Sequence, residues 1–408
     1  MSETFFVNIF IMLLSALALG EVFKRIGQPA LVGHLLAGVI IGPSLLNVVH
    51  PDESLETIIN LAIFFLMFLA GLELHPEEIR RAGKNAIILS VIAFIVPFLG
   101  GVVVSDFLGL PMVTSLFIGL TLAITAVPVS AVVLMEFGLL KSKMGSTIMT
   151  AGIVDDILSL ITLAIILQLA QSGGDDFEFG DIGFSIFKIV AFLGGIFLLT
   201  YLLKKTHHWL PQKVNPIFAK LKTREVGFGI LLISAVGLSL IAESVGLHFV
   251  IGTFFAGLLV YQEIIGKENV EKINTVFSAI TFGFLSPIFF AFIGIEFHAQ
   301  SIIEDIPLFL ILLAVAIAGK IGGGFIGGKI ARFSNSESKI IGYLVNSRGM
   351  VELVIATIGF ELGIIDKTLF TIIVAVGFIT TIMAPIMARM ALRGSPSSWK
   401  TDNNNNSN

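Results

Sequence analysis

Two adjacent aspartates, Asp155 and Asp156, stand in the middle of an apolar run that covers residues 144–170. In a membrane-spanning helix, a carboxylate at the bilayer centre costs at least roughly 2.5–3.5 kcal/mol, so the pair predicts a functional site. Consecutive helical residues point about 100° apart. One carboxylate can therefore pair with a protein cation while the other faces a water-filled cavity, where it could bind a proton or a metal ion.

Three further charges are predicted inside apolar runs. Lys320 lies in the run 307–330, and either aspartate could be its partner, because a buried lysine without a partner would lose its proton. Arg348 and Glu352 are spaced i, i+4 and can pair on one helix. The three acids and two bases leave one surplus negative charge, which one proton or one monovalent cation would neutralise.

Oxygen ligands for such a cation are predicted at two interrupted helices. Pro128 in the run 111–136 removes a backbone donor and frees carbonyls one turn earlier, and the run 338–361 contains Asn346-Ser347-Arg348-Gly349 at the equivalent depth. Hard alkali cations prefer oxygen ligands. We therefore expect Na⁺ at Asp156 and Asp155, with Thr125 and Ser130 as further ion- or proton-binding residues. The expected supporting residues are Lys320 as charge partner, Arg348, Glu352, Ser347, Asn346 and Pro128.

The elements that must position these residues follow from the composition. Of the 408 residues, 55% are hydrophobic and 13% charged, against roughly 25% charged in soluble domains. The chain is therefore predicted to be an all-α polytopic membrane protein. About thirteen spans are expected, at 5–23, 30–49, 55–73, 84–106, 111–136, 144–170, 182–203, 226–245, 248–262, 272–296, 307–330, 338–361 and 368–392.

The positions of lysine and arginine predict the orientation in the membrane. Of the 25 basic residues, 21 fall in connections on one side of the predicted spans or in the tail, whereas only Lys188 and Lys367 fall on the other side. Basic residues mark the cytosolic side. We expect a multi-pass protein of the cell (plasma) membrane, with its amino terminus outside and its carboxyl terminus in the cytosol.

The chain also contains a weak internal repeat. The segments LVGHLLAGVI, FLAGLELH, EFGLL and GIVDDI match VIGTFFAGLL, AFIGIEFH, ELGII and GFITTI in the same order, 219 to 225 residues later. Glu73 and Glu296 recur in this repeat and are interpreted as the ends of spans. Matched helices are seven spans apart, an odd number, which predicts a six-plus-six inverted repeat with two crossed discontinuous helices.

With these residues in view, the chain resembles the monovalent cation:proton antiporter family 2, its NapA and Kef-like branch. The resemblance covers about residues 5–392 and is carried by ITAVPVSAVVL, GIVDDI, AGKIGGG and NSRGMVEL. It implies an NhaA/NapA-like fold, a homodimer, Asp156 as the main ion ligand and Asp155 as the partner of Lys320. The resemblance further implies electrogenic exchange, because family members with an Asp-Asp pair tend to be electrogenic.

The resemblance also implies a division of the chain. Helices 1–3 (1–83) and 8–10 (226–306) would form a dimerisation domain, and helices 4–6 (84–171) and 11–13 (307–393) a moving core. A linker helix and cytosolic loop (172–225) would join them, and 394–408 would be a disordered tail. Kef-type relatives carry a nucleotide-binding domain. This sequence has no GxGxxG after a predicted strand.

These features together predict a secondary transporter, without a cofactor and not an enzyme, that exchanges Na⁺ or Li⁺ for H⁺ by elevator-like alternating access. A K⁺/H⁺ antiporter of Kef-like type is the main alternative, and a cation channel or a sodium-coupled symporter is more remote. An intramembrane aspartyl protease is excluded, because adjacent aspartates cannot converge on one water. The expected partners are H⁺, Na⁺ or Li⁺, with K⁺ in place of these cations in the alternative, and membrane lipid. With a net charge of −4, nucleic acid is not expected.

Overall fold

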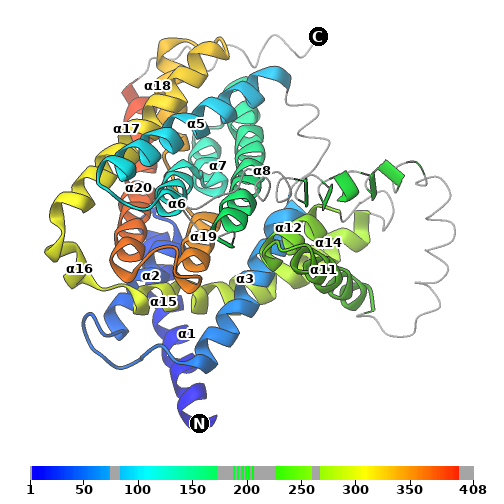
Figure 1. Ribbon diagram of the computed structural model, residues 1–408. Helices are drawn as coiled ribbons and strands as arrows, with labels where there is room; N and C mark the ends of the chain where they lie inside the picture. Colours follow the sequence, from blue (N-terminus) through cyan, green and yellow to red (C-terminus); the bar gives the residue numbers. More distant parts are fainter. Residues whose placement is uncertain are drawn as a thin grey trace.

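The computed structural model describes residues 2–73, 83–171, 226–259 and 267–394, together with short helical stretches between residues 187 and 205. Every element within these residues is helical, as predicted. Much of the expected linker 172–225 and the tail 395–408 lie outside the described residues, as does His75 of the repeat. Figure 1 shows how the described helices are arranged.

Eight of the described helices pack into one group, called here the crossing group. Its closest contacts join α17 to α5 and α18, and α5 to α6 and α8. Figure 1 shows α5, α8, α17 and α18 together in the upper part of the view. The members are α5 (Gly83–Phe107), α6 (Met112–Ala123), α7 (Val127–Glu136), α8 (Lys143–Gln171), α17 (Ile306–Ile330), α18 (Asn335–Val345), α19 (Met350–Glu361) and α20 (Lys367–Gly394).

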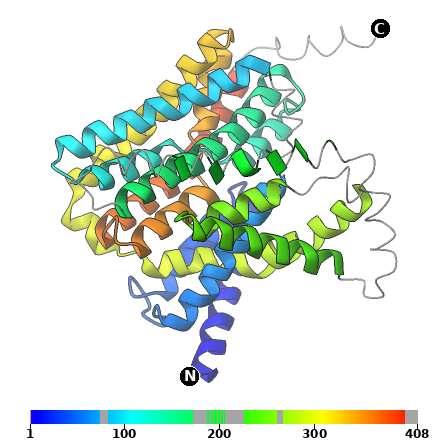
Figure 2. The same cartoon turned by 45° about the vertical axis from the view of Figure 1, so that its right-hand side comes forward.

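The remaining long elements form a second group, called here the flanking group. Its closest contacts join α1 to α2, α2 to α15, α3 to α12 and α11 to α12, and it lies below and to the right in Figure 1 and below the crossing group again in Figure 2. Contacts between the groups are sparse, and the short helix α16 (Ala299–Glu304) links them. The members are α1 (Ser2–Arg25), α2 (Ala30–Ile41), α3 (Glu53–Glu73), α11 (Val226–Ser244), α12 (Phe249–Leu258), α14 (Lys267–Ile280), the π-helix η1 (Thr281–Leu285) and α15 (Ser286–Glu296).

The spans agree with the prediction in part. Within the described residues, eight helices are long and apolar enough to cross a membrane, and the pair α18 and α19, bent by 44°, would be a ninth. Three shorter apolar helices correspond to further predicted spans: Ala30–Ile41, Phe228–Ser244 and Phe249–Leu258. The predicted span 182–203 lies mostly outside the described residues, so the number thirteen stays a prediction.

One predicted span, 30–49, is too long. Helix α2 ends at Ile41, and Gly42 has an extended backbone (φ −78°, ψ −175°). The reason is Pro43, because the ring of a proline disfavours the helical conformation in the residue before it. Twelve helical residues rise about 18 Å, less than the roughly 30 Å of a hydrocarbon core, so α2 does not cross the membrane alone as a straight helix.

Glycines hold the helices of the flanking group at backbone contact. Gly38 of α2 and Gly294 of α15 face each other, and a Cβ built on either one would lie 2.8 Å from the other's Cα. Likewise a Cβ on Gly257 of α12 would overlap the Phe68 carbonyl of α3, which packs against α12. Gly38 and Gly257 are matched residues of the sequence repeat, so equivalent glycines make equivalent contacts.

The crossing group contains two more contacts of this kind, which the sequence comparison missed. A Cβ on Gly101 of α5 would lie 2.8 Å from the Cα of Gly119 in α6, and a Cβ on Gly324 of α17 would lie 2.8 Å from the Cα of Gly342 in α18. The two pairs are separated by 223 residues, within the 219 to 225 of the repeat. Isolated glycines carry too little sequence signal to be aligned, although their packing is equivalent.

The close contact at Gly38 predicts a clear effect of a single methyl group. We expect Gly38→Ala to force α2 and α15 apart and to lower the free energy of unfolding by about 1–3 kcal/mol, the usual range for overpacking. The measurement is thermal unfolding of the purified protein in detergent. Gly237→Ala in α11 is the control, since a Cβ there meets no atom within 4 Å. Equal melting temperatures for the two variants would contradict the packing argument.

Candidate functional site

The chain leaves the helical conformation at the first predicted interruption. Helix α6 ends at Ala123, the backbone is extended at Ile124 and Ala126, and α7 begins at Val127 with Pro128 in its first turn. Proline is tolerated there because the first N–H groups of a helix have no helical partner. The break therefore leaves the last carbonyl groups of α6 without helical partners in the interior of the protein.

The second interruption lies between Val345 of α18 and Met350 of α19, and it crosses the first. The Ala126 N–H donates to the Ser347 carbonyl (2.8 Å), and the Ser347 hydroxyl donates back to the Ala126 carbonyl (2.9 Å). The Ser130 hydroxyl donates to the Leu344 carbonyl at the end of α18 (2.9 Å). Each break thus satisfies part of the backbone that the other one exposes.

Two buried cations cap the broken end of α6. Lys320 Nζ donates to the Ala123 carbonyl and to the Ala93 carbonyl of α5 (3.3 Å). Arg348 donates to the Thr121 carbonyl and, through Nη2, to the Leu122 carbonyl (2.8 Å). Both side chains are fully buried. Cations are favourable at a helix carboxyl end because the free carbonyls and the helix dipole are negative there.

Each capping cation has its own carboxylate. Lys320 Nζ lies 3.7 Å from Asp155 Oδ2, and Arg348 Nη1 lies 3.1 Å from Glu352 Oε1. All four side chains are buried. Of the two partners that the residue pattern alone left open for Lys320, the structure places Asp155 beside it, the partner that the family resemblance implies. The two pairs are each neutral, so the surplus negative charge of the set falls on Asp156.

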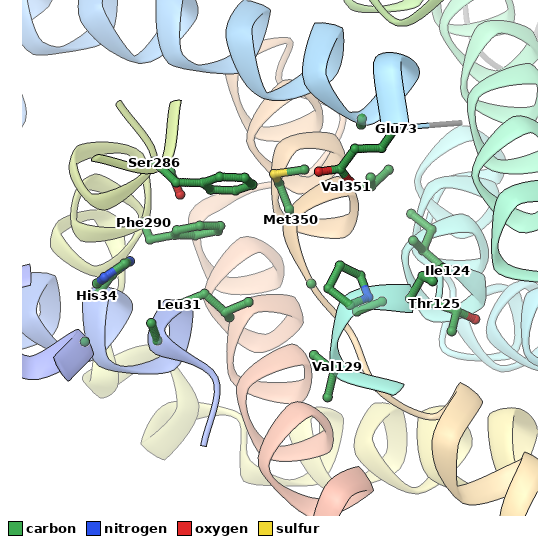
Figure 3. A pocket seen from close by; sticks show the side chains of 18 of the residues that line it. Leu31, His34, Glu73, Ile124, Thr125, Val129, Ser286, Phe290, Met350 and Val351 are labelled. Atoms are coloured by element: carbon green, nitrogen blue, oxygen red, sulfur yellow. The ribbon is translucent and has the colours of Figure 1, made fainter. Parts of the chain in front are cut away.

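Asp156 lines a cavity of about 860 Å³ between the two groups of helices. Within the described residues it forms no ion pair. The cavity wall includes both breaks, at Thr125–Val129 and Gly349–Val351. Figure 3 shows His34 and Phe290 of the flanking group on one side and Thr125 on the other. The cavity extends to the exposed residues Glu21 and Lys24, on the side that the basic residues predict to be cytosolic.

A second acid faces the same cavity, and the sequence interpretation missed its position. Glu73 was expected only to end a span, and it is indeed the last residue of α3, but it also lines the cavity. Figure 3 shows its carboxylate beside Met350 and Val351 of α19. Glu73 can both end α3 and line the cavity because the cavity lies between the two groups of helices. Sequence patterns within one helix do not show which residues face such a cavity.

The remaining predicted residues are divided between the cavity and the crossing. Thr125 lines the cavity and lies beside the Asp155 carboxylate, and Pro128 also lines it. Ser130 and Ser347 lie 3.4 Å apart (Oγ to Oγ) and join the two breaks. Ser130, expected as an ion ligand, is therefore placed away from the cavity lining. The amide of Asn346 is buried at the end of α18, without a hydrogen-bond partner in the described residues.

The second half of the chain has threonines where the first has aspartates. Thr381, which the repeat aligns with Asp156, donates its hydroxyl to the Arg348 carbonyl (2.7 Å) and accepts from the Arg348 N–H (3.3 Å). It thereby fixes the backbone of the residue whose side chain caps α6. Sequence alignment identified the equivalence but not this supporting contact.

The sequence profile of the family described as "Sodium/hydrogen exchanger, transmembrane" matches residues 9–394. The chain belongs to the sodium/hydrogen exchanger family. The match names this family rather than the antiporter family 2 that the motifs resemble, and it confirms the assignment as an antiporter.

Named relatives of this exchanger extend over nearly its whole length. The "Na(+)/H(+)-K(+) antiporter GerN" of Bacillus cereus is 30% identical over 95% of this chain and 96% of its own. The "Na(+)/H(+) antiporter" of Enterococcus hirae is 30% identical over 94% and 97%. The solved structure of the sodium proton antiporter MjNhaP1 from Methanocaldococcus jannaschii, 18% identical, covers 94% of this chain and 97% of its own with a TM-score of 0.72, which shows the same fold.

The double role of Lys320 in this exchanger predicts a large effect of its removal. Lys320→Gln leaves Asp155 buried without its cation, and breaking a buried pair from one side costs about 3–5 kcal/mol. We expect a lowered melting temperature in detergent. The double variant Lys320→Gln/Asp155→Asn should recover most of the loss, since it removes both charges.

Lys329→Gln serves as the control for the Lys320 variants. It lies in the last turn of the same helix, where its Nζ donates to the Phe333 carbonyl at the protein surface (3.3 Å). It should melt close to the unmodified protein. If Lys320→Gln is no less stable than Lys329→Gln, the capping role assigned to Lys320 is wrong.

Proposed function

We propose that this protein exchanges Na⁺ or Li⁺ for H⁺ across the membrane, with both ions competing for the carboxylate of Asp156. One observation carries the proposal: of two adjacent aspartates, Asp155 lies against Lys320 and Asp156 faces the cavity. A single uncompensated carboxylate at the end of a solvent-accessible cavity can hold one cation or one proton, and it cannot hold both on the same oxygen atoms.

The groups at the inner end of the cavity, around Asp156, are suited to binding a hard monovalent cation. Besides Asp156, this end of the cavity offers the Thr125 hydroxyl and, at the first break, backbone that has left the helical conformation. These are oxygen ligands, the type that alkali cations prefer. Water entering through the cavity would complete the coordination of Na⁺ at Asp156 and Asp155. Because Asp155 is paired with Lys320, its carboxylate would have a supporting role.

Exchange further requires that the loaded site reaches either side of the membrane in turn. The crossed breaks are tied to each other by three hydrogen bonds, two between Ala126 and Ser347 and one from Ser130 to Leu344, so they would move as one body. Contacts of this body with the flanking group are sparse. We therefore assign the crossing group to the moving core and the flanking group to a dimerisation domain of a homodimer, with elevator-like motion between them.

The direction of the cavity completes the proposed picture. With the amino terminus outside the cell membrane, the mouth at Glu21 and Lys24 opens toward the cytosol. The structure would then represent the inward-open state. The Asp-Asp pair offers a second protonation site, because Asp155 can take up a proton of its own when no cation lies at the pair. We therefore propose that more than one proton is exchanged per cation and that the exchange is electrogenic.

K⁺ is the competing substrate. One relative is named an Na⁺/H⁺-K⁺ antiporter, and the cavity wall does not select among alkali ions by charge. Proteoliposomes with an internal pH dye decide between the two, since Na⁺ and Li⁺ but not K⁺ should release internal protons under the main proposal. Acceleration by valinomycin with K⁺ present on both sides at equal concentration would show that the exchange is electrogenic.

The site assignment predicts loss of exchange on neutralising Asp156. Asp156→Asn keeps the size of the side chain and removes the charge, so Na⁺ should no longer move protons in the proteoliposome assay. Asp106→Asn, an exposed aspartate at the end of α5, is the matched control and should transport normally. Full activity of Asp156→Asn would reject Asp156 as the ion site.

Competition for one carboxylate predicts how transport depends on pH. As the pH falls, a larger fraction of Asp156 is protonated and closed to the cation, so the apparent KM for Na⁺ should rise, approaching about tenfold per pH unit for one competing proton. The maximal rate at saturating Na⁺ should change less than the KM. An apparent KM that is constant over two pH units, with a falling maximal rate, would indicate separate sites for the two ions.

A further inference from the structure

Two turns of the flanking group have the same backbone construction. Gly27 follows α1 and Gly246 follows α11, with left-handed φ angles of +76° and +83°. In each turn the glycine N–H donates to the carbonyl three residues earlier, Lys24 (3.1 Å) or Glu243 (2.9 Å). In each, the next N–H donates to the carbonyl five residues before it, at 2.9 Å in both. The glycines are 219 residues apart, as Gly33 and Gly252 are in the repeat.

Both turns are held firmly within the flanking group. A Cβ on Gly33 of α2 would overlap the Leu19 carbonyl of α1, and a Cβ on Gly252 of α12 would lie 2.5 Å from the Leu238 carbonyl of α11. Helices in backbone contact on both sides of a short turn leave it little freedom. The carbonyl groups of Gly27 and Gly246 are therefore fixed points of the flanking group.

A side chain of the crossing group donates a hydrogen bond to each of these two carbonyl groups. Arg389 of α20 donates to the Gly27 carbonyl from both Nη1 and Nη2 (3.3 Å each), while its Nε donates to Glu136 Oε2 at the end of α7 (2.9 Å). Gln168 of α8 donates its Nε2 to the Gly246 carbonyl. These contacts join two groups that otherwise touch sparsely.

The two contacts lie at opposite ends of the crossing group. Gly27 adjoins the cavity mouth at Lys24, whereas Gln168 lies twelve residues beyond Asp156 on the same helix, or about 18 Å along it. Both contacts are closed while the cavity is open toward Lys24. A shift by even one helical turn, about 5.4 Å, exceeds the reach of a hydrogen bond, so neither contact survives such a motion unchanged.

We propose that Arg389 and Gln168 are positioning residues that latch the crossing group to the flanking group in this one state and release it in the other. The inference rests on the alternating access proposed above. The latches contact no ion; they set the fraction of molecules whose cavity is open on the Gly27 side. Losing one latch reduces that fraction, and a reduced fraction of competent molecules raises the apparent KM on that side.

The absence of cysteine from the chain makes the fraction measurable. Met149→Cys places one thiol on the cavity wall. A membrane-impermeant maleimide, added to inside-out vesicles, labels it only while the cavity is open on the inner side. We expect Arg389→Gln and Gln168→Leu, each in this background, to slow labelling about three- to tenfold, the effect of one hydrogen-bonded contact on an equilibrium. Arg389→Lys keeps the charge but cannot donate from two nitrogen atoms to the Gly27 carbonyl. Its labelling rate should lie between that of Arg389→Gln and the parental rate.

The control is Arg25→Gln, which removes the same charge at the same face, from a pair with Glu21 that stays within α1 (2.9 Å). It should label at the parental rate. Sodium-dependent proton movement, measured in right-side-out and inside-out vesicles, should show a raised KM for Na⁺ on the inner side only in the latch variants. A purely structural role would lower the melting temperature and leave the two sides equally affected.

Two results would overturn the inference. Parental labelling rates in both latch variants would show that the contacts do not hold the state, and an effect of Arg389→Gln alone would reject the paired arrangement. The proposed function fails separately, if the unmodified protein moves no protons in response to Na⁺. Labelling does not depend on transport, so it reports on the latches in either case.

Discussion

The broken end of α6 imposes the constraint from which the rest of the site follows. A helix that stops in the interior exposes carbonyl groups where water is scarce, and unpaired polar groups cost several kcal/mol in such surroundings. Here they are satisfied by Lys320 and Arg348. Two buried cations in turn require two carboxylates, which Asp155 and Glu352 supply. Four of the five interior charges are thus explained by the backbone, and the fifth, Asp156, has no ion-pair partner within the described residues, as the proposed ion site requires.

The same constraint makes the site rigid, which the proposed movement as one body requires. The breaks are crossed and bonded to each other, and glycine contacts such as Gly101 with Gly119 hold the neighbouring helices at backbone distance. Most of the crossing-group residues that line the cavity toward the flanking group are apolar. Apolar surfaces impose no directional bonds, so sliding is resisted only where a directed contact crosses the boundary.

The sequence was sufficient to predict the features that depend on single residues. Pro128 and the Asn346–Gly349 stretch located both interruptions, and buried charge identified the midplane set. The residue pattern alone could not decide which aspartate pairs with Lys320, because two side chains that point 100° apart cannot be oriented until the neighbouring helices are placed; only the family resemblance pointed to Asp155. Glu73 in the cavity and the arginine cap on α6 were missed for the same reason, since each depends on contacts between segments far apart in the chain.

The two interrupted helices are alike in backbone but not in charge. The end of α6 is capped by cations, whereas the end of α18 receives hydroxyl groups from Ser130 and Ser347, and threonines replace the aspartates in the second half. Hydroxyl groups that are bonded locally can be buried without a counter-ion. Both halves thus contain an interrupted helix, and in the described part of the chain only the first carries an unpaired carboxylate beside it. Under the proposed function, the side chains rather than the backbone decide how many ions are carried, so two similar backbone frames would load a single ion.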